Sequence, residues 1–333
     1  MKVNITNLYG MERHNVTQIA QNETAQIAKQ LGANELSIFR YDVSSDSPTE
    51  LSKRLDGINA SLQVGDIVIF QYLTWNGYDF EEAYLQRLRV YHARIAIFVH
   101  DVIGLRFASE GDIKRSVAIF NLADLLILPS KAMEDALRAY GLTVKKVVYQ
   151  TIFDRLLKEE PPVATFAREM TFAGSQRRFP FSKNWNYPTR LRLFSKVDNP
   201  DRSLNIEYMG FHEEAEMIRL FNRGFGLCWS EDIPGCPERR YSQLNASFKL
   251  STYLAAGLPL VANDDISVAP LIKKYGLGFL APDLATASEM VQKCTPQEYA
   301  QMADRVHRYS FLLRQGWNFR RVYTETVDKL LTD

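Results

Sequence analysis

The chain has 333 residues, and its 40 Lys and Arg residues almost balance its 39 Asp and Glu residues, which gives a formal net charge of +1. This balance argues against a surface built to bind a polyanion, so we expect no nucleic-acid partner. At roughly 100 to 200 residues per domain, the length indicates about two domains, each large enough to bury its own core.

The cysteines and the apolar runs indicate in which compartment the protein lies and whether it spans a membrane. Cys228, Cys236 and Cys294 are odd in number and form no CxxC pair, so they indicate neither a disulfide framework nor a zinc site. No apolar run approaches the roughly 20 residues that span a bilayer, and residues 1–8 lack the pattern of a signal peptide. We therefore expect a cytoplasmic protein without a membrane span.

In the first half of the chain, short apolar runs alternate with segments that carry apolar residues at helical spacing, which is typical of βα units and a parallel sheet. The predicted strands are 2–7, 35–41, 66–72, 94–100, 125–129 and 145–149, and the predicted helices are 17–31, 80–91, 112–122 and 131–140. A proline-containing stretch then interrupts the pattern, so we expect a linker near residues 153–166.

The second half restarts the alternation and predicts another set of βα units. The predicted strands are 170–173, 190–194, 205–209, 225–229 and 258–262, and the predicted helices are 213–222, 247–256, 268–275 and 296–313. A final amphipathic segment, 317–331, is long enough to leave the second domain and pack on the first. The predicted fold class is α/β. We expect two doubly wound domains, at 1–153 and 154–315, and a C-terminal helix in 316–333 that packs on the first domain. The ligand loops are expected around a cleft between the domains.

A turn containing glycine and arginine follows the strand predicted at 170–173. Gly174 permits close approach of a ligand to the backbone, and Arg178 offers the bidentate donors that suit a diphosphate. Exposed amides in such a turn also face phosphate oxygens. The alternative is a solvated turn with surface arginines.

The helix predicted at 247–256 is a second candidate for binding an anion. Asn245 or Ser247 can cap it, and Gly257 can end it. Lys249 lies in the first turn, where a cation gains nothing from the helix dipole. The lysine is therefore best explained if it and the helix N-terminus hold a negative ligand together, while a solvated surface lysine is the simpler alternative.

Two further groups of residues lie where predicted strands end. Tyr208, Gly210 and Phe211 could cover a flat base, although aromatic residues at strand ends belong more often to the core. His100 and Asp101 close the strand at 94–100, where a carboxylate beside a histidine could act as a general base on an acceptor hydroxyl. The alternative for the pair is a histidine held at a strand end for structural reasons.

Several motifs are absent from the sequence. It contains no GxGxxG after the first strand, no GxxxxGK[ST] and no GxSxG. The remaining histidines are scattered without metal-ligand spacing, and there is no DxD-type metal motif, so we expect neither a cofactor nor a metal. These absences weaken the dehydrogenase, P-loop NTPase and α/β-hydrolase interpretations.

The segment 249–259 resembles the helix that grips the diphosphate of the nucleotide sugar in bacterial GT-B glycosyltransferases, and residues 128–133 resemble a strand-to-helix junction of their first domain. More specifically, the chain resembles the glucosyltransferase-3 (nucleotide sugar synthetase-like) family of streptococci and lactobacilli, which acts on serine-rich repeat adhesins. The resemblance runs almost end to end through residues 5–7, 51–58, 65–71, 74–76, 100–102, 178–179, 224–227 and the helix of Lys249.

This resemblance implies a GT-B fold of two Rossmann-like domains, a metal-independent site and a homo-oligomer, often a tetramer. The implied donor is UDP-glucose, with UDP-N-acetylglucosamine (UDP-GlcNAc) as second choice, and the implied acceptor is O-linked GlcNAc on a serine-rich repeat glycoprotein.

Arg178 and Lys249 match the diphosphate-contacting positions of the family, and we expect them to be catalytic together with Asp101 as the base. Many GT-B relatives hold the ribose with a glutamate at the position of Thr252, so a neighbouring residue is expected to take that role here. The other donor-side candidates are Gly174, Tyr208, Gly210, Phe211, Asn245, Ser247 and Thr252, and the acceptor-side candidates are Thr6, Asn7, Thr74, Trp75 and His100.

Two alternatives to a glycosyltransferase remain open from the sequence. A UDP-sugar epimerase can use the same two-domain fold without an acceptor. A catalytically silent subunit would bind a UDP-sugar or an adhesin and stabilise an active transferase.

Overall fold

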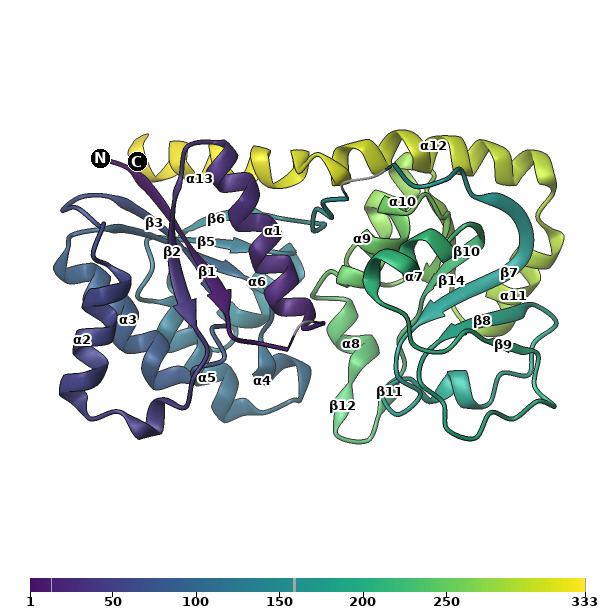
Figure 1. Cartoon of the computed structure of the whole chain (residues 1–333), viewed down its shortest axis with the longest axis horizontal. Coiled ribbons are helices and arrows are strands. Elements are labelled where there is room, and N and C mark those ends of the chain that lie inside the picture. Colours follow the sequence, from purple (N-terminus) through teal and green to yellow (C-terminus); the bar gives the residue numbers. More distant parts are fainter. Residues whose placement is uncertain (13, 158–159, 333) are drawn as a thin grey trace. The chain divides into compact units, whose positions relative to one another are not determined.

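The computed structural model describes residues 1–12, 14–157 and 160–332 (Figure 1). The chain divides into two compact units. The first comprises Met1–Thr151 together with the segment that begins at Gly316, and the second is Ile152–Gln315. Each unit contains a six-stranded parallel sheet flanked by helices, so the chain belongs to the α/β class, as the alternating pattern predicts.

The sheet of the first unit has the order β2-β1-β3-β4-β5-β6. Its strands are β1 (Val3–Tyr9), β2 (Asn34–Phe39), β3 (Ile67–Tyr72), β4 (Arg94–Val99), β5 (Leu125–Leu128) and β6 (Lys146–Tyr149). Its helices are α1 (Val16–Gln30), α2 (Pro48–Ile58), α3 (Tyr78–Val90), α4 (Ile103–Arg106), α5 (Glu110–Phe120), α6 (Lys131–Arg138) and α13 (Trp317–Thr332). Every residue of β3 and β5 is buried, which is the pattern of strands covered on two faces.

Helix α13 lies against α1, β5 and β6 of this unit, although it is the last element in the chain (Figure 1). Its Phe319 ring stacks on Phe98 of β4, with ring centroids 5.6 Å apart. At its other end, Lys329 Nζ donates to the Val147 carbonyl of β6 at 2.9 Å. An apolar face and the C-terminal part of the helix therefore attach α13 to the first unit.

The sheet of the second unit has the order β14-β13-β10-β7-β8-β9. Its strands are β7 (Thr165–Ala173), β8 (Arg190–Phe194), β9 (Ile206–Tyr208), β10 (Arg223–Cys228), β13 (Leu260–Asn263) and β14 (Gly278–Ala281), and β11 (Asp232–Ile233) and β12 (Cys236–Pro237) form a separate hairpin. Its helices are α7 (Glu214–Leu220), α8 (Glu238–Ser242), α9 (Phe248–Ala255), α10 (Ala269–Tyr275), α11 (Leu284–Lys293) and α12 (Pro296–Arg314).

In each sheet the strand order reverses at one inner pair. The chain adds strands to opposite sides of β1 and β3 in the first unit, and to opposite sides of β7 and β10 in the second. Ligands of open α/β sheets bind beyond the carboxyl ends of the strands at such a reversal. The topology therefore places the candidate sites after β1 and β3, and after β7 and β10.

The structure departs from the predicted elements in a few places. Strand β7 begins at Thr165, inside the expected linker, because Phe166 packs on the core and its ring lies 5.5 Å from that of Tyr299. Residues 158 and 159 of that linker lie outside the described residues. The elements that were not predicted are helices α2, α4, α8 and α11 and strands β11, β12 and β14. Helix α2 carries Leu51, Leu55 and Ile58 at helical spacing, but only Leu55 of these is fully buried, so the helix lies at the surface of the unit.

Candidate functional site

The reversal in the second sheet brings Gly174 and Lys249 together. Gly174 directly follows β7, and Lys249 is the second residue of α9. A Cβ atom at position 174 would lie 3.1 Å from Lys249 Nζ and 3.0 Å from the ring of Phe172. Because contacts this short would force the neighbouring side chains to move, glycine at this position leaves room for the ammonium group.

Two aromatic rings surround the ammonium group of Lys249. Its Nζ lies 4.0 Å from the ring centroid of Phe172 and 4.1 Å from that of Phe179. In the part of the chain that the structure describes, Nζ forms neither a hydrogen bond nor an ion pair. Ring faces attract a cation, but they do not replace the anion that a buried ammonium needs.

Burial lowers the pKa of Lys249 from 10.5 to about 7. Near neutral pH the side chain therefore stands between its charged and uncharged forms. A negatively charged ligand on Nζ would favour the charged form and raise the pKa again. This behaviour fits a lysine that meets its anion when a ligand binds, rather than a lysine that belongs to a permanent ion pair.

Arg178 lies beside one of these rings, that of Phe179, and has a fixed partner. Its Nε and Nη2 donate to the two carboxylate oxygens of Glu238 at 2.7 and 2.9 Å, which is a bidentate pair. Its guanidinium carbon lies 5.1 Å from the ring of Phe179, which also contacts Lys249. Glu238 is buried, whereas the side chain of Arg178 is 46% exposed. The sequence-predicted Gly174, Arg178 and Lys249 therefore form one cluster.

Two of the other candidates on and before α9, Thr252 and Asn245, are held by local hydrogen bonds. Thr252 is buried, and its hydroxyl donates to the Phe248 carbonyl one turn earlier at 3.1 Å. Asn245 Oδ1 accepts from the Ala246 amide, and its Nδ2 donates to the Tyr241 hydroxyl. Ser247 is the N-cap residue of α9, but its side chain makes no capping hydrogen bond.

The predicted base pocket lies where β9 ends, at the far edge of the same sheet. The Tyr208 hydroxyl donates to the carbonyl of Asp201 at 3.1 Å. Gly210 has a φ of +80°, and the side chain of Phe211 is 62% exposed. β9 lies two strands from β7, so these residues are at the same end of the sheet as the Lys249 cluster, and Tyr208 packs against the core cluster that includes Phe172 and Phe179.

In the first unit, hydrogen bonds join Thr6 and His100 through Gln71. The Gln71 amide donates to Thr6 Oγ1 at 2.8 Å, and Gln71 Oε1 lies 2.8 Å from His100 Nε2. All three side chains are buried. Burial lowers the pKa of His100 to about 3, so its imidazole is neutral at physiological pH.

Thr74 and Trp75 form the turn that follows β3. The buried carboxylate of Glu81 in α3 accepts hydrogen bonds from the Thr74 amide at 2.8 Å and from the Thr74 hydroxyl at 3.2 Å. Trp75 has a φ of +59°, and 40% of its surface is exposed. Asn7, on the neighbouring β1, is buried and donates to the Tyr9 hydroxyl at 2.9 Å. The turn therefore presents an indole ring on a fixed backbone.

Asp101 lies at the end of β4 and is half-buried. Its Oδ1 accepts from the Val102 amide at 3.0 Å, and its Oδ2 lies 3.5 Å from Nη1 of Arg106. The carboxylate therefore lies at the end of a parallel strand, with one oxygen fixed by a backbone amide and the other beside a guanidinium.

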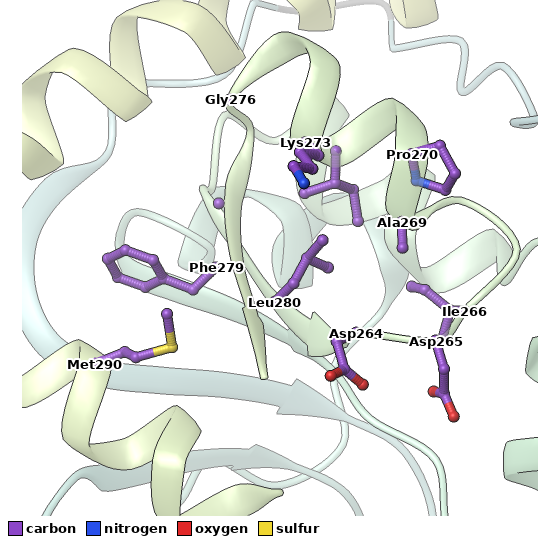
Figure 2. A pocket seen from close by; sticks show the side chains of 12 residues that line it. Asp264, Asp265, Ile266, Ala269, Pro270, Lys273, Gly276, Phe279, Leu280 and Met290 are labelled. Atoms are coloured by element: carbon purple, nitrogen blue, oxygen red, sulfur yellow. The ribbon is translucent and has the colours of Figure 1, made fainter. Parts of the chain in front are cut away.

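A separate pocket of the second unit lies between α10, α11 and β14 (Figure 2). Figure 2 shows Asp264 and Asp265 side by side at one end and the apolar side chains of Phe279 and Met290 at the other. Arg239 pairs with Asp264 and Asp265. The two carboxylates repel an anionic ligand, Lys273 is the one cation among the described residues that line the pocket, and β14 is an edge strand that does not border the reversal between β7 and β10. This pocket is therefore poorly suited to a nucleoside diphosphate.

Sequence reasoning missed the residues that surround the two cations. Phe172 lies in a predicted strand, and its ring gives no signal beyond that of a core residue. Glu238 is 60 positions from Arg178 and comes from a hairpin and short helix without periodicity. Glu81 lies on a predicted helix, where an acidic residue usually faces solvent. These contacts arise from the fold and have no local signature.

Over residues 1–12, 14–157 and 160–332, the structure contains no helix that is long and apolar enough to cross a membrane. The same residues provide no cluster of three or more His, Cys, Asp or Glu side chains arranged to hold a metal ion.

The chain was compared with known proteins. Family models described as "Glucosyltransferase 3-like, N-terminal domain" and "Glucosyltransferase 3-like, C-terminal domain" match residues 2–152 and 170–326. A relative named Glucosyltransferase 3 from Streptococcus gordonii is 42% identical, with all of each chain covered.

Among solved structures, sucrose-phosphate synthase from Thermosynechococcus elongatus matches with a TM-score of 0.67 at 12% identity, with 99% of each chain covered. HepE from Anabaena, solved in complex with UDP and glucose, matches with a TM-score of 0.63 at 12% identity over 99% of this chain and 100% of that chain. These likenesses show that the fold is GT-B. The chain therefore belongs to the Glucosyltransferase 3-like family and is a glycosyltransferase.

Proposed function

We propose that the chain transfers glucose from UDP-glucose to O-linked GlcNAc on a serine-rich repeat glycoprotein. One observation carries the donor side of this proposal: the ammonium of Lys249 lies over Phe172 and Phe179 beside Gly174, without a carboxylate bound to it among the described residues. Arg178 is at the edge of the same cluster. Two cations at the carboxyl end of β7 suit the diphosphate of a nucleotide sugar.

The difficult step of the reaction is the departure of UDP, on which negative charge develops. The proposal assigns the neutralisation of this charge to Lys249, Arg178 and the first amides of α9, without a metal ion. Groups fixed before the reaction stabilise developing charge more effectively than water does, because they need not reorganise. In the proposal, the exposed Phe211 and the half-buried Tyr208 cover the base, and Ser247 and Asn245, at the N-terminal end of α9, contact the ribose or phosphate.

The acceptor hydroxyl must lose a proton as it attacks the anomeric carbon. Asp101 is the proposed base, because it lies at the end of β4 and the Val102 amide fixes one of its oxygens. Trp75 offers a ring on which a sugar can stack, held by the hydrogen bonds between Thr74 and Glu81. The buried side chains of His100 and Thr6, which are joined through Gln71, would hold the ends of β1, β3 and β4 in place.

The donor glucose is supported by the family name and by a GT-B neighbour solved with UDP and glucose. The protein acceptor and a tetrameric assembly rest on the resemblance between the sequence and the serine-rich repeat family. The proposed location is the cytoplasm, in agreement with the free thiols of Cys228, Cys236 and Cys294.

The test is to incubate the purified chain with a panel of UDP-sugars and a serine-rich peptide that carries O-linked GlcNAc, and to measure the intact mass of the peptide. The proposal expects one added hexose with UDP-glucose and less product with UDP-GlcNAc. A changed free nucleotide sugar in the absence of peptide would indicate an epimerase instead. Binding of UDP-glucose without any product would indicate a catalytically silent subunit.

A further inference from the structure

Glu238 is the partner that determines where the guanidinium of Arg178 lies. It is the first residue of α8, its side chain is buried, and its two oxygens accept from Nε and Nη2 of Arg178 at 2.7 and 2.9 Å. Cys236 on β12 also donates its thiol hydrogen to Glu238 Oε1, with an S···O distance of 3.3 Å. Because the carboxylate is enclosed while the arginine is 46% exposed, Glu238 is the fixed member of the pair.

The side-on geometry of this pair leaves part of the guanidinium available. An arginine has five N–H donors, and the bonds to Glu238 use the one on Nε and one on Nη2. The remaining donors, on Nη1 and on the other side of Nη2, point away from the carboxylate. The ring of Phe179 lies 5.1 Å from the guanidinium carbon. The carboxylate and the ring together thus restrict the direction of the free donors.

A carboxylate beside a phosphate site is unfavourable, because the two negative charges repel each other. Glu238 is ion-paired with Arg178, and its negative charge also favours the charged form of Lys249. Its position is explained if holding Arg178 in place contributes more to binding than the repulsion costs. A flexible arginine would have to lose side-chain entropy when the ligand binds, whereas a fixed one has lost it already.

We propose that Glu238 is a positioning residue that holds Arg178 in the orientation in which its free N–H groups bind the diphosphate of the nucleotide. This inference rests on the proposed function, because it presupposes that a nucleoside diphosphate binds at the Lys249 cluster. It adds a residue that neither the sequence motifs nor the family resemblance assigns.

The test is a double-mutant cycle on the full chain, with UDP affinity measured by isothermal titration calorimetry at pH 7. The variants are Glu238→Gln, Arg178→Ala and the double variant, and Glu289→Gln on the exposed face of α11 is the matched control. We expect Glu238→Gln to weaken UDP binding about tenfold and to have almost no effect in the Arg178→Ala background. Glu289→Gln should bind UDP like the wild type.

Whether Glu238→Gln weakens or strengthens UDP binding distinguishes a positioning role of Glu238 from simple charge repulsion. If Glu238 only repels the diphosphate, Glu238→Gln strengthens binding, and this result overturns the inference. An equal weakening in the wild-type and Arg178→Ala backgrounds also overturns it, because Glu238 would then act on the fold rather than through Arg178.

Glu238→Asp covers the case in which the glutamine variant does not fold. It keeps the negative charge but is one methylene too short for the bidentate geometry. The inference expects weaker UDP binding, and wild-type binding by Glu238→Asp contradicts it. If the wild-type chain does not bind UDP, the proposed function is contradicted, and the inference, which rests on it, is contradicted as well. If the wild-type chain binds UDP but the effects of Glu238→Gln and Arg178→Ala on affinity simply add, only the inference is contradicted.

Discussion

At the scale of single residues, the proposed donor site contains two cations that differ in their partners. Arg178 is bound to Glu238, whereas Lys249 contacts aromatic rings and forms no ion pair within the described residues. A buried ammonium without an anion lowers the stability of the free protein and becomes favourable once a ligand supplies the negative charge. The two side chains therefore have different roles, one fixed in orientation and one variable in charge.

Lys249→Met tests the role of the ammonium. Methionine keeps most of the apolar contact with Phe172 and Phe179 but removes the charge, so we expect a melting temperature no lower than that of the wild type. Loss of a charge that stabilises the leaving group should lower kcat/KM for glucosyl transfer about 100-fold. Steady-state kinetics and thermal unfolding measure the two quantities. Wild-type kcat/KM in a folded Lys249→Met variant would exclude the proposed role.

The pKa of Lys249 predicts a pH dependence of UDP binding. Because burial lowers the pKa to about 7, the free protein holds a neutral amine above pH 7, and binding of UDP to the ammonium then takes up a proton. UDP affinity should fall between pH 7 and pH 9, by up to about tenfold per pH unit. The terminal phosphate of UDP ionises near pH 6 and adds little change in this range.

The same shift has a consequence for folding. The pKa is lower in the folded state than in the unfolded state, so between pH 7 and 10.5 the unfolded chain binds more protons and the contribution of Lys249 to stability rises with pH.

The predicted pH dependence of UDP affinity is measured by calorimetric titration at several pH values, with Lys249→Met as the control. A pH dependence that persists unchanged in Lys249→Met would assign the proton to another group.

Sequence reasoning could identify Gly174, Arg178 and Lys249, because each follows a strand or opens a helix and so belongs to the ligand end of a sheet. It could not identify Glu238, since a contact across 60 residues between a turn and a short helix leaves no trace in local spacing. It also gave no reason to expect that the hydroxyl of Thr252 would be used within its own helix.

At the scale of elements, helix α3 supports the turn after β3 through one buried acid. Glu81 accepts from the amide and the hydroxyl of Thr74, and burial raises its pKa to about 7. The folded pKa is above the unfolded value of 4.5, so the folded protein binds more protons between pH 4.5 and 7, and the contribution of Glu81 to stability declines as pH rises through that range.

Glu81→Gln should therefore stabilise the chain at pH 8 and change little at pH 5. Glutamine keeps the acceptor for Thr74 and avoids the buried negative charge, so we expect the melting temperature at pH 8 to rise by roughly 2–4 °C. Thermal unfolding at the two pH values measures this, with Glu82→Gln on the exposed side of α3 as the control. An equal loss of stability at pH 5 and pH 8 would show that the charge is not the cause.

Most strands and helices could be predicted because their apolar residues repeat at the period of the element. The predicted helix at 247–256 lies within one residue of α9 at each end, and Gly257, at φ +86°, follows it as expected for a C-terminal glycine. Helix α2 was missed although the sequence carries local signals for it, because Leu51, Leu55 and Ile58 follow helical spacing and Ser47 and Glu50 form a capping box. Strand β14 is a half-buried edge strand with no strong alternation.

At the scale of the whole molecule, the alternation of strands and helices predicts the α/β class, and the GT-B fold is shown by the comparisons. Neighbours that are only 12% identical share this fold, so the fold is compatible with many sequences. The activity must therefore be argued from the side chains at the strand ends. In the second unit these side chains form a cationic cluster at the reversal between β7 and β10, as the topology requires of a ligand site.

A crystal structure of the chain with UDP tests this account most directly. The account predicts that the diphosphate lies within hydrogen-bond reach of Lys249 Nζ and of the free donors of Arg178, with the Arg178–Glu238 pair retained. A nucleotide bound in the pocket of Asp264 and Asp265, or a diphosphate with no contact to Lys249, would contradict it.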